Sequence, residues 1–116
     1  MIMSHYAVAY ATQWADKKEV GCLMADRDDI LSRMSRAASD SLAVQLYSLL
    51  DAEEYNAGPA GIGDGKYYTH AELTDALDRL VAMPDLSTWG PECAFLLVLL
   101  TGMAAAKLRR CFIWYF

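Results

Sequence analysis

Cys93 and His70 are the pair of side chains whose types best suit nucleophilic catalysis. Pro91 fits the first position of a helix, which would place Cys93 in the first turn, where free N–H groups can stabilise a thiolate. His70 is the natural candidate for the base. Because Glu92 is adjacent and the flanking residues are apolar, we expect Cys93 to be a buried structural cysteine, and we assign no catalytic residue.

Three carboxylates, Glu72, Asp75 and Asp78, are spaced so that they lie near one another on a helix. Such a group could bind a metal ion or act as acid and base. However, Asp75 and Arg79 are four residues apart, which is the spacing of an ion pair on a solvated helix face. We therefore predict no metal site, and we expect His5 to be a surface or pairing residue of the first strand rather than a ligand.

Four glycines lie within residues 58–65, where consecutive backbone N–H groups could cradle a phosphate. A phosphate-binding loop would need glycine at Ala60 and serine or threonine at Tyr67, so the spacing does not fit. A calcium-binding loop also fails, because its closing glutamate would fall on Ala71. We interpret the segment as a loop and predict no cofactor.

Acidic residues are concentrated in the middle of the chain. The net charge is −5 overall, but residues 40–92 contain ten acidic residues and only two basic ones, Lys66 and Arg79. This charge disfavours nucleic acid, whose binding depends on Lys and Arg that neutralise phosphates, and it suits a basic protein partner. The alternative is that the acids only keep an apolar protein soluble. We predict a partner-binding surface of acids flanked by tyrosines: Asp51, Glu53, Glu54, Tyr55, Tyr67, Tyr68, Glu72, Asp75 and Asp78.

The cysteines indicate a reducing compartment. Cys22, Cys93 and Cys111 are odd in number and far apart, which fits neither a disulfide framework nor a zinc ribbon. The first ten residues show no secretory signal. The apolar run over residues 93–106 would span about 21 Å as a helix, short of the roughly 30 Å hydrocarbon core of a bilayer. We therefore expect a cytoplasmic protein with no membrane segment.

Strands are predicted near both ends of the sequence. Alternation of large and small residues indicates a strand over residues 5–11, and a run of β-forming residues indicates another over 111–116. A short edge strand is expected over 66–68, after the glycine loop. Residues 12–25 show no decisive periodicity.

Helices are predicted from capping residues and apolar spacing at residues 26–38, 41–55, 69–83 and 91–109. The first would be capped by Asp26, and the third begins with a capping box formed by Thr69 and Glu72. Residues 94–106 contain one polar side chain, so the last helix is expected at the centre of the fold, with Leu97 and Leu100 in the core.

These elements predict an α+β fold that is mainly helical, with four helices around the apolar C-terminal helix and a small sheet from the N- and C-terminal strands. An all-α bundle is the alternative. The 116 residues, 55% of them apolar, predict a single domain over 1–116. If the strand over 111–116 lay at an exposed sheet edge, a second copy could pair with it and form a homodimer.

The predicted function is that of a small acidic cytoplasmic protein that binds and inhibits a basic protein partner. Toxin-immunity proteins and phage-encoded inhibitors are proteins of this kind. The prediction depends on the acidic segment, the high apolar content and the failure of each catalytic motif. Two alternatives stay open: a small enzyme with a site at Cys93 or at the carboxylates, and a structural subunit of a homo-oligomer.

Overall fold

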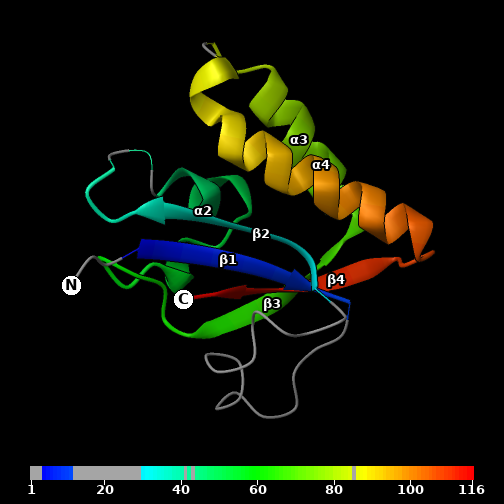
Figure 1. Cartoon of the computed structure of the whole chain (residues 1–116), viewed down its shortest axis with the longest axis horizontal. Coiled ribbons are helices and arrows are strands. Elements are labelled where there is room, and N and C mark those ends of the chain that lie inside the picture. Colours follow the sequence, from blue (N-terminus) through cyan, green and yellow to red (C-terminus); the bar gives the residue numbers. More distant parts are fainter. Residues whose placement is uncertain (1–3, 12–29, 41, 43, 85) are drawn as a thin grey trace.

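An antiparallel sheet forms one layer of the structure (Figure 1). The computed structural model describes residues 4–11, 30–40, 42, 44–84 and 86–116. The strands in this part of the chain are β1 (Ser4–Tyr10), β2 (Ile30–Ala37), β3 (Asp64–Thr69) and β4 (Arg110–Tyr115). They lie in the order β2-β1-β4-β3, so that β2 and β3 form the two edges.

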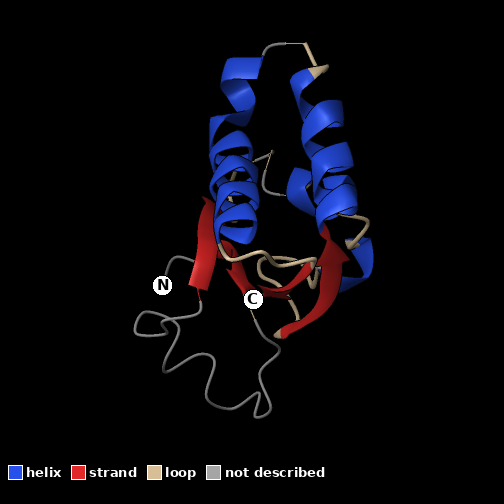
Figure 2. Ribbon diagram, turned by 90° about the vertical axis from the view of Figure 1, so that its right-hand side faces the viewer, coloured by secondary structure: helices blue, strands red, loops and turns tan. Residues whose placement is uncertain are grey.

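Helices cover one face of this sheet (Figure 2). The elements are α2 (Gln45–Leu49), α3 (His70–Val81), α4 (Gly90–Ala105) and the 3₁₀ helices η2 (Glu53–Tyr55) and η3 (Leu86–Trp89). α3 and α4 lie side by side and run in opposite directions. The prediction of a mainly helical fold with four helices around α4 is wrong, and so is the all-α alternative, because the described residues form three α-helices and a four-stranded sheet.

β2 occupies most of the segment that was predicted as a helix over residues 26–38. Its apolar residues match a helical stripe, but Met34 lies opposite Ala7 of β1 and Ser32 lies opposite Ala9. Pairing with a long neighbouring strand satisfies the backbone groups and overrides the local pattern, as tertiary contacts often do. The predicted cap at Asp26 and the ambiguous residues 12–25 lie outside the described residues.

The helix predicted over residues 41–55 is much shorter than expected. α2 ends at Leu49, and Asp51 follows with a φ of 53°, a left-handed conformation that a helix interior does not contain. The chain then forms the short helix η2. The turn between the two helices places Asp51 and Glu53 on an exposed corner next to α3.

The third predicted helix is confirmed as α3, which begins at the predicted capping box. The Thr69 hydroxyl accepts a hydrogen bond from the Glu72 N–H at 3.1 Å, and the Glu72 carboxylate accepts one from the Thr69 N–H at 2.9 Å. These bonds satisfy backbone donors that would otherwise lack partners at the helix start. The expected edge strand before this helix is also present, as β3.

The predicted terminal strands are confirmed as β1 and β4, and they pair with each other, with Ala9 opposite Ile113. β4 is an inner strand, because its other edge pairs with β3 through Ile113 and Lys66. Its backbone groups are therefore engaged on both sides, and a homodimer through an exposed edge of this strand is not available to the molecule.

The main core lies between the sheet and the helices, and α4 contributes one face to it. Phe95, Leu96, Leu99 and Met103 are at most 2% exposed. Leu97 is 53% exposed and Val98 is 55% exposed, so the prediction that Leu97 belongs to the core is wrong, while Leu100 is partly buried. The helix is apolar on all sides, yet it covers the sheet from one side and is not enclosed.

Candidate functional site

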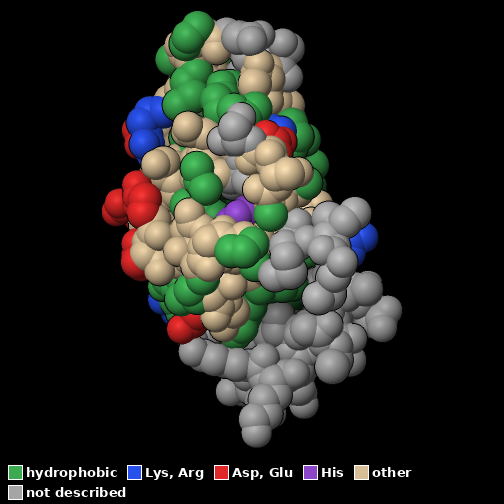
Figure 3. Space-filling model, turned by 90° about the vertical axis from the view of Figure 1, so that its left-hand side faces the viewer, with side chains coloured by type: hydrophobic (Ala, Val, Ile, Leu, Met, Phe, Trp, Pro, Cys, Tyr) green, Lys and Arg blue, Asp and Glu red, His purple; other side chains and the backbone are tan. Residues whose placement is uncertain are grey.

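The predicted carboxylates come together on one corner of the molecule, where α2, η2 and α3 meet. Acidic side chains are visible along one margin of the view in Figure 3. Asp51 lines a hollow of about 140 Å³ together with Glu72, Asp75 and Arg79 of α3, and Glu53 and Glu54 of η2 follow Asp51 in the chain. We call this surface the acidic face and define it by six exposed residues: Asp51, Glu53, Glu54, Glu72, Asp75 and Asp78.

Two cations lie beside the acidic face, and backbone carbonyls engage both of them. Arg79 donates to the Leu49 carbonyl at 2.8 Å and forms an ion pair with Asp75 at 3.1 Å. Lys66 donates to the Asp51 carbonyl at 2.7 Å. These contacts attach α3 and β3 to the end of α2. The acidic face keeps a large negative excess, because the described residues show no ion pair to the other five carboxylates.

The three predicted tyrosines do not form one surface. Tyr68 is 2% exposed at the floor of the hollow, where its hydroxyl bonds to that of Tyr115 at 2.5 Å, and burial raises the Tyr68 pKa. Tyr55 stacks on Tyr115 at 5.3 Å and donates to a backbone carbonyl. Tyr67 is on the opposite sheet face, against Phe112. Sequence neighbours on a strand point to opposite faces, so Tyr67 and Tyr68 cannot share a surface.

Arg36 forms ion pairs with two of the acids that were counted in the acidic segment, the buried Glu92 and the partly exposed Asp40. Arg36 of β2 donates to both oxygens of Glu92, at 2.9 and 2.6 Å, and to Asp40 at 3.0 Å. Glu92 is fully buried at the start of α4. The Thr88 carbonyl accepts a further bond from the same guanidinium at 3.0 Å. Two of the ten acids of residues 40–92 therefore have a structural role and do not add to the charge of the acidic face.

Cys93 and His70 lie too far apart to act together. His70 begins α3 and Cys93 lies near the start of α4, and these neighbouring helices run in opposite directions. The 12 residues of α3 separate the two ends by about 18 Å at 1.5 Å per residue. The His70 ring instead lies 3.4 Å from the Thr74 hydroxyl. Cys93 is half-buried rather than buried, and burial raises the pKa of the Cys111 thiol to about 12.

Of the two alternatives for His5, the structure excludes a surface position and shows a pairing residue, opposite Arg36 of β2. His5 is 6% exposed, and its Nδ1 atom lies 2.9 Å from the Tyr47 hydroxyl. Burial lowers the pKa of His5 and raises that of Tyr47 to about 12. Desolvation of the charged form accounts for both directions. The neutral pair fixes α2 against the end of β1, and it is a structural contact.

The glycines of residues 58–65 have a structural explanation. A Cβ atom on Gly65 would lie 2.1 Å from the Ile113 carbonyl oxygen, so any other residue would force β3 away from β4. Gly63 has a φ of 70°, which favours glycine. The described residues contain no group of three or more His, Cys, Asp or Glu side chains that could hold a metal ion.

Comparison of the chain with protein-family models, with curated proteins and with solved structures gave no match. Among the described residues, no helix is both long enough and apolar enough to cross a bilayer. Function has to be argued from the arrangement of side chains alone.

Proposed function

We propose that this protein binds a basic protein partner through the acidic face and blocks that partner's function. The observation that carries the proposal is the set of six exposed carboxylates on η2, α3 and the turn after α2, of which Asp51, Glu72 and Asp75 line one hollow. Opposite charge on a partner would increase the rate of encounter and favour the correct orientation. Both proteins would reside in the cytoplasm, where Cys93 and Cys111 stay reduced as free thiols.

The convergence is specific to this corner of the molecule. The acids that are far apart in sequence are brought together because Arg79 binds the end of α2 and Lys66 binds the turn after it. A solubilising function alone would not need this clustering, since scattered charges serve solubility equally well. A Lys or Arg side chain of the partner would contact Asp51 and Glu72 at the hollow that these two residues line, because Arg79 already pairs with Asp75.

Charge reversal tests the proposal. The variant Glu53→Lys, Glu54→Lys and Asp78→Lys changes only exposed side chains for which the described residues show no ion pair, so its fold should be retained. Wild-type protein and this variant would be used as parallel baits in extracts of the native host. We expect wild type to retain a basic protein that the triple variant does not retain.

The control is Asp64→Lys, a single charge reversal of the same kind at a residue outside the acidic face. It should retain the partner. Association with purified partner should slow as ionic strength rises, because salt screens charges over about 8 Å at physiological strength. Addition of one equivalent of this protein should then abolish the partner's activity. A partner that binds wild type and triple variant equally well, and whose binding is insensitive to salt, would contradict the proposal.

A further inference from the structure

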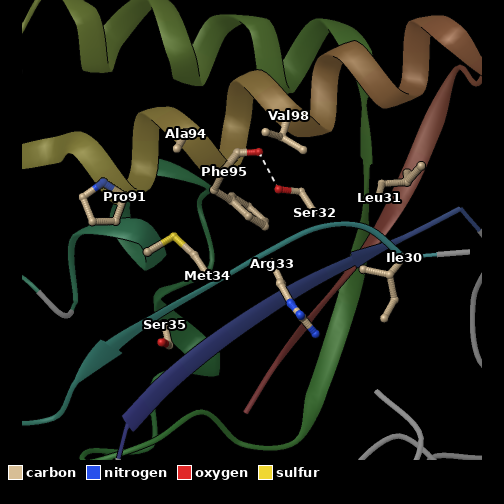
Figure 4. Close-up of a pocket in the computed structure, with 10 residues that line it drawn as sticks. All are labelled: Ile30, Leu31, Ser32, Arg33, Met34, Ser35, Pro91, Ala94, Phe95 and Val98. Atoms are coloured by element: carbon tan, nitrogen blue, oxygen red, sulfur yellow. Dashed lines mark hydrogen bonds between the residues drawn. The ribbon is translucent and has the colours of Figure 1, made fainter. Parts of the chain in front are cut away.

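A groove lies between the outer edge of β2 and the first half of α4 (Figure 4). Its volume is about 640 Å³, and its apolar walls are Leu31 and Met34 from β2 and Ala94, Phe95 and Val98 from α4. The polar residues Ser32, Arg33 and Ser35 of β2 also border it. We call it the β2–α4 groove. It is separate from the acidic face, which lies on η2, α3 and the turn after α2.

The backbone of β2 is open along this groove. β2 is the first strand in the sheet order, and among the described residues only β1 pairs with it. An edge strand presents a row of N–H and C=O groups that can pair with another extended chain. Natural proteins usually block such an edge with charge or proline. The exposed charge of this edge is Arg33, which points away from α4, and α4 presents no charged residue from residue 93 to residue 106.

The groove has fixed walls, because two contacts hold α4 against β2. The Ser32 hydroxyl donates to the Phe95 carbonyl at 2.9 Å in the middle of the groove. Arg36 forms its bidentate pair with the buried Glu92 at one end. A preformed groove loses less conformational entropy when it binds an extended chain.

The α4 wall continues as an exposed apolar surface beyond the groove. Val98 is 55% exposed and Leu97 is 53% exposed. Both line a further hollow of about 400 Å³, which Leu31 and Thr101 also border. Clusters of exposed apolar side chains on small proteins commonly mark interaction sites.

The two sides of β2 differ in charge. Ser32 and Met34 point toward α4, whereas Arg33 and Ser35 point away from it. Arg33 is exposed, borders a hollow of about 350 Å³ on that other side, and forms no ion pair with the described residues. Side chains of an added strand would alternate in the same way. Those facing α4 would meet an apolar wall, and those facing away would meet a cation.

We propose that β2 binds an extended segment of a partner protein as an additional strand, with apolar and acidic residues alternating along that segment. The apolar side chains contact Met34, Phe95 and Val98 in the β2–α4 groove. The acidic side chains face Arg33. Backbone hydrogen bonds to β2 supply affinity, and the alternation supplies specificity, as in other cases of strand addition.

A second copy of this chain does not match the groove. Pairing of β2 with another β2 would bring a second Arg33 to the same edge, with no carboxylate to meet it, because Glu92 and Asp40 already pair with Arg36. The other edge strand, β3, carries Lys66 on its helix side, where it reaches the Asp51 carbonyl. That cation would meet the uncharged wall of α4. The charge pattern therefore selects a partner segment rather than another copy.

The test uses the whole protein labelled with ¹⁵N and an eight-residue peptide in which valine and glutamate alternate. We expect saturable chemical-shift changes at the amides of β2 and of the first half of α4. A valine–lysine peptide and a peptide with its four valines before its four glutamates should give much weaker changes. Absence of saturable changes, or changes centred on α3, would overturn the proposal.

Substitutions test separately the charge of Arg33 and the apolar wall at Val98. Arg33→Glu should weaken binding of the glutamate peptide by about fivefold, as expected when one rim attraction becomes a repulsion, and should strengthen binding of the lysine peptide. Val98→Lys should abolish binding of the glutamate peptide. Arg109→Glu is the matched control, since it makes the same charge change at an exposed residue that borders neither hollow, and it should bind normally.

Thermal melts would establish that each variant is folded, and Arg33→Gln would replace Arg33→Glu if the latter melts early. Sedimentation of the free protein at increasing concentration tests whether a second copy of this chain occupies the groove instead of a partner segment. A dimer that Val98→Lys dissociates would assign the groove to a second copy and overturn the proposal. A monomer whose peptide binding responds as described would support it.

Discussion

α3 and α4 pack side by side on the same face of the sheet, but their solvent-facing sides have opposite chemistry. α3 exposes Glu72, Asp75 and Asp78, while α4 exposes Leu97 and Val98. Exposure to water is favourable for the carboxylates on the outer side of α3. It is unfavourable for the apolar side chains on the outer side of α4, which a binding partner could bury. The difference indicates that the two helices have distinct roles, one in a charged surface and the other in an apolar one.

Each helix also uses one arginine–carboxylate pair, in different surroundings. Arg79 and Asp75 lie within α3, with side chains 53% and 71% exposed. Arg36 and Glu92 connect β2 to α4, with side chains 12% and 1% exposed. A buried charge without its partner is costly, whereas an exposed charge is hydrated by water. The comparison predicts unequal effects of four substitutions.

The largest effect is expected for Arg36→Ala, which leaves the Glu92 carboxylate buried without a cation. Breaking a buried pair costs about 3 to 5 kcal/mol of unfolding free energy. Urea denaturation would measure it. The double variant Arg36→Met and Glu92→Leu should recover much of the loss, since it removes both charges. If Arg36→Ala alone were as stable as wild type, the pair would not hold α4 to β2.

The next largest effect is expected for Leu99→Ala, compared with Leu97→Ala on the same helix. Leu99 is fully buried, so its truncation should cost about 3 kcal/mol through lost burial and a cavity. Leu97 is half exposed, and its truncation should cost less than about 1 kcal/mol. The midpoints of urea denaturation would compare the two losses, provided that the dependence of the unfolding free energy on urea concentration is the same in both variants. Equal losses would mean that the outer side of α4 is covered within the monomer.

A smaller effect is expected for Thr69→Ala, which removes the capping hydroxyl of α3. The loss should be about 1 kcal/mol. Thr69→Ser keeps the hydroxyl and serves as the control, so its thermal midpoint should stay near that of wild type. A midpoint for Thr69→Ala equal to that of Thr69→Ser would show that the capping box does not stabilise α3.

The smallest effect is expected for Asp75→Ala, which breaks the exposed pair with Arg79. Exposed pairs four residues apart contribute about 0.3 to 0.5 kcal/mol. The loss should decrease further in 1 M salt, because screening weakens the pair in wild type as well. Melts at low and high salt would measure both values. A loss above that of Thr69→Ala would indicate that Arg79 needs Asp75 to hold the end of α2.

The sequence predicted the elements whose signals are local. The capping box of Thr69 and Glu72 depends only on residues that are close in sequence, and α3 begins there. β1 and β4 consist of residues that suit a pleated strand, and both are present. The acidic residues of η2, α3 and the turn after α2 were identified by composition, and the structure brings Asp51 close to Glu72 and Asp75.

Elements that depend on distant partners were not predictable in this way. Leu31 and Met34 fit a helical stripe as well as a strand. Pairing with β1 determines that this segment is a strand. Glu92 looked like an ordinary acid because its partner, Arg36, is 56 residues away. A single apolar pattern also cannot distinguish an enclosed helix from one that leaves Leu97 exposed. The β2–α4 groove requires both β2 and α4, so no local signal indicated it.

The position of β4 has a consequence for biosynthesis. β4 is the last of these strands to leave the ribosome, yet it lies between β1 and β3 and connects them. The four-stranded sheet cannot form until residues 110–115 have been synthesised. Pairing of β4 with the distant β1 is a long-range contact, and such contacts slow folding. β1 and β3 would meanwhile expose unpaired backbone and apolar side chains on the nascent chain. Chaperone contact during this interval would protect the nascent chain from aggregation, because its N-terminal and C-terminal strands pair only at the end of synthesis.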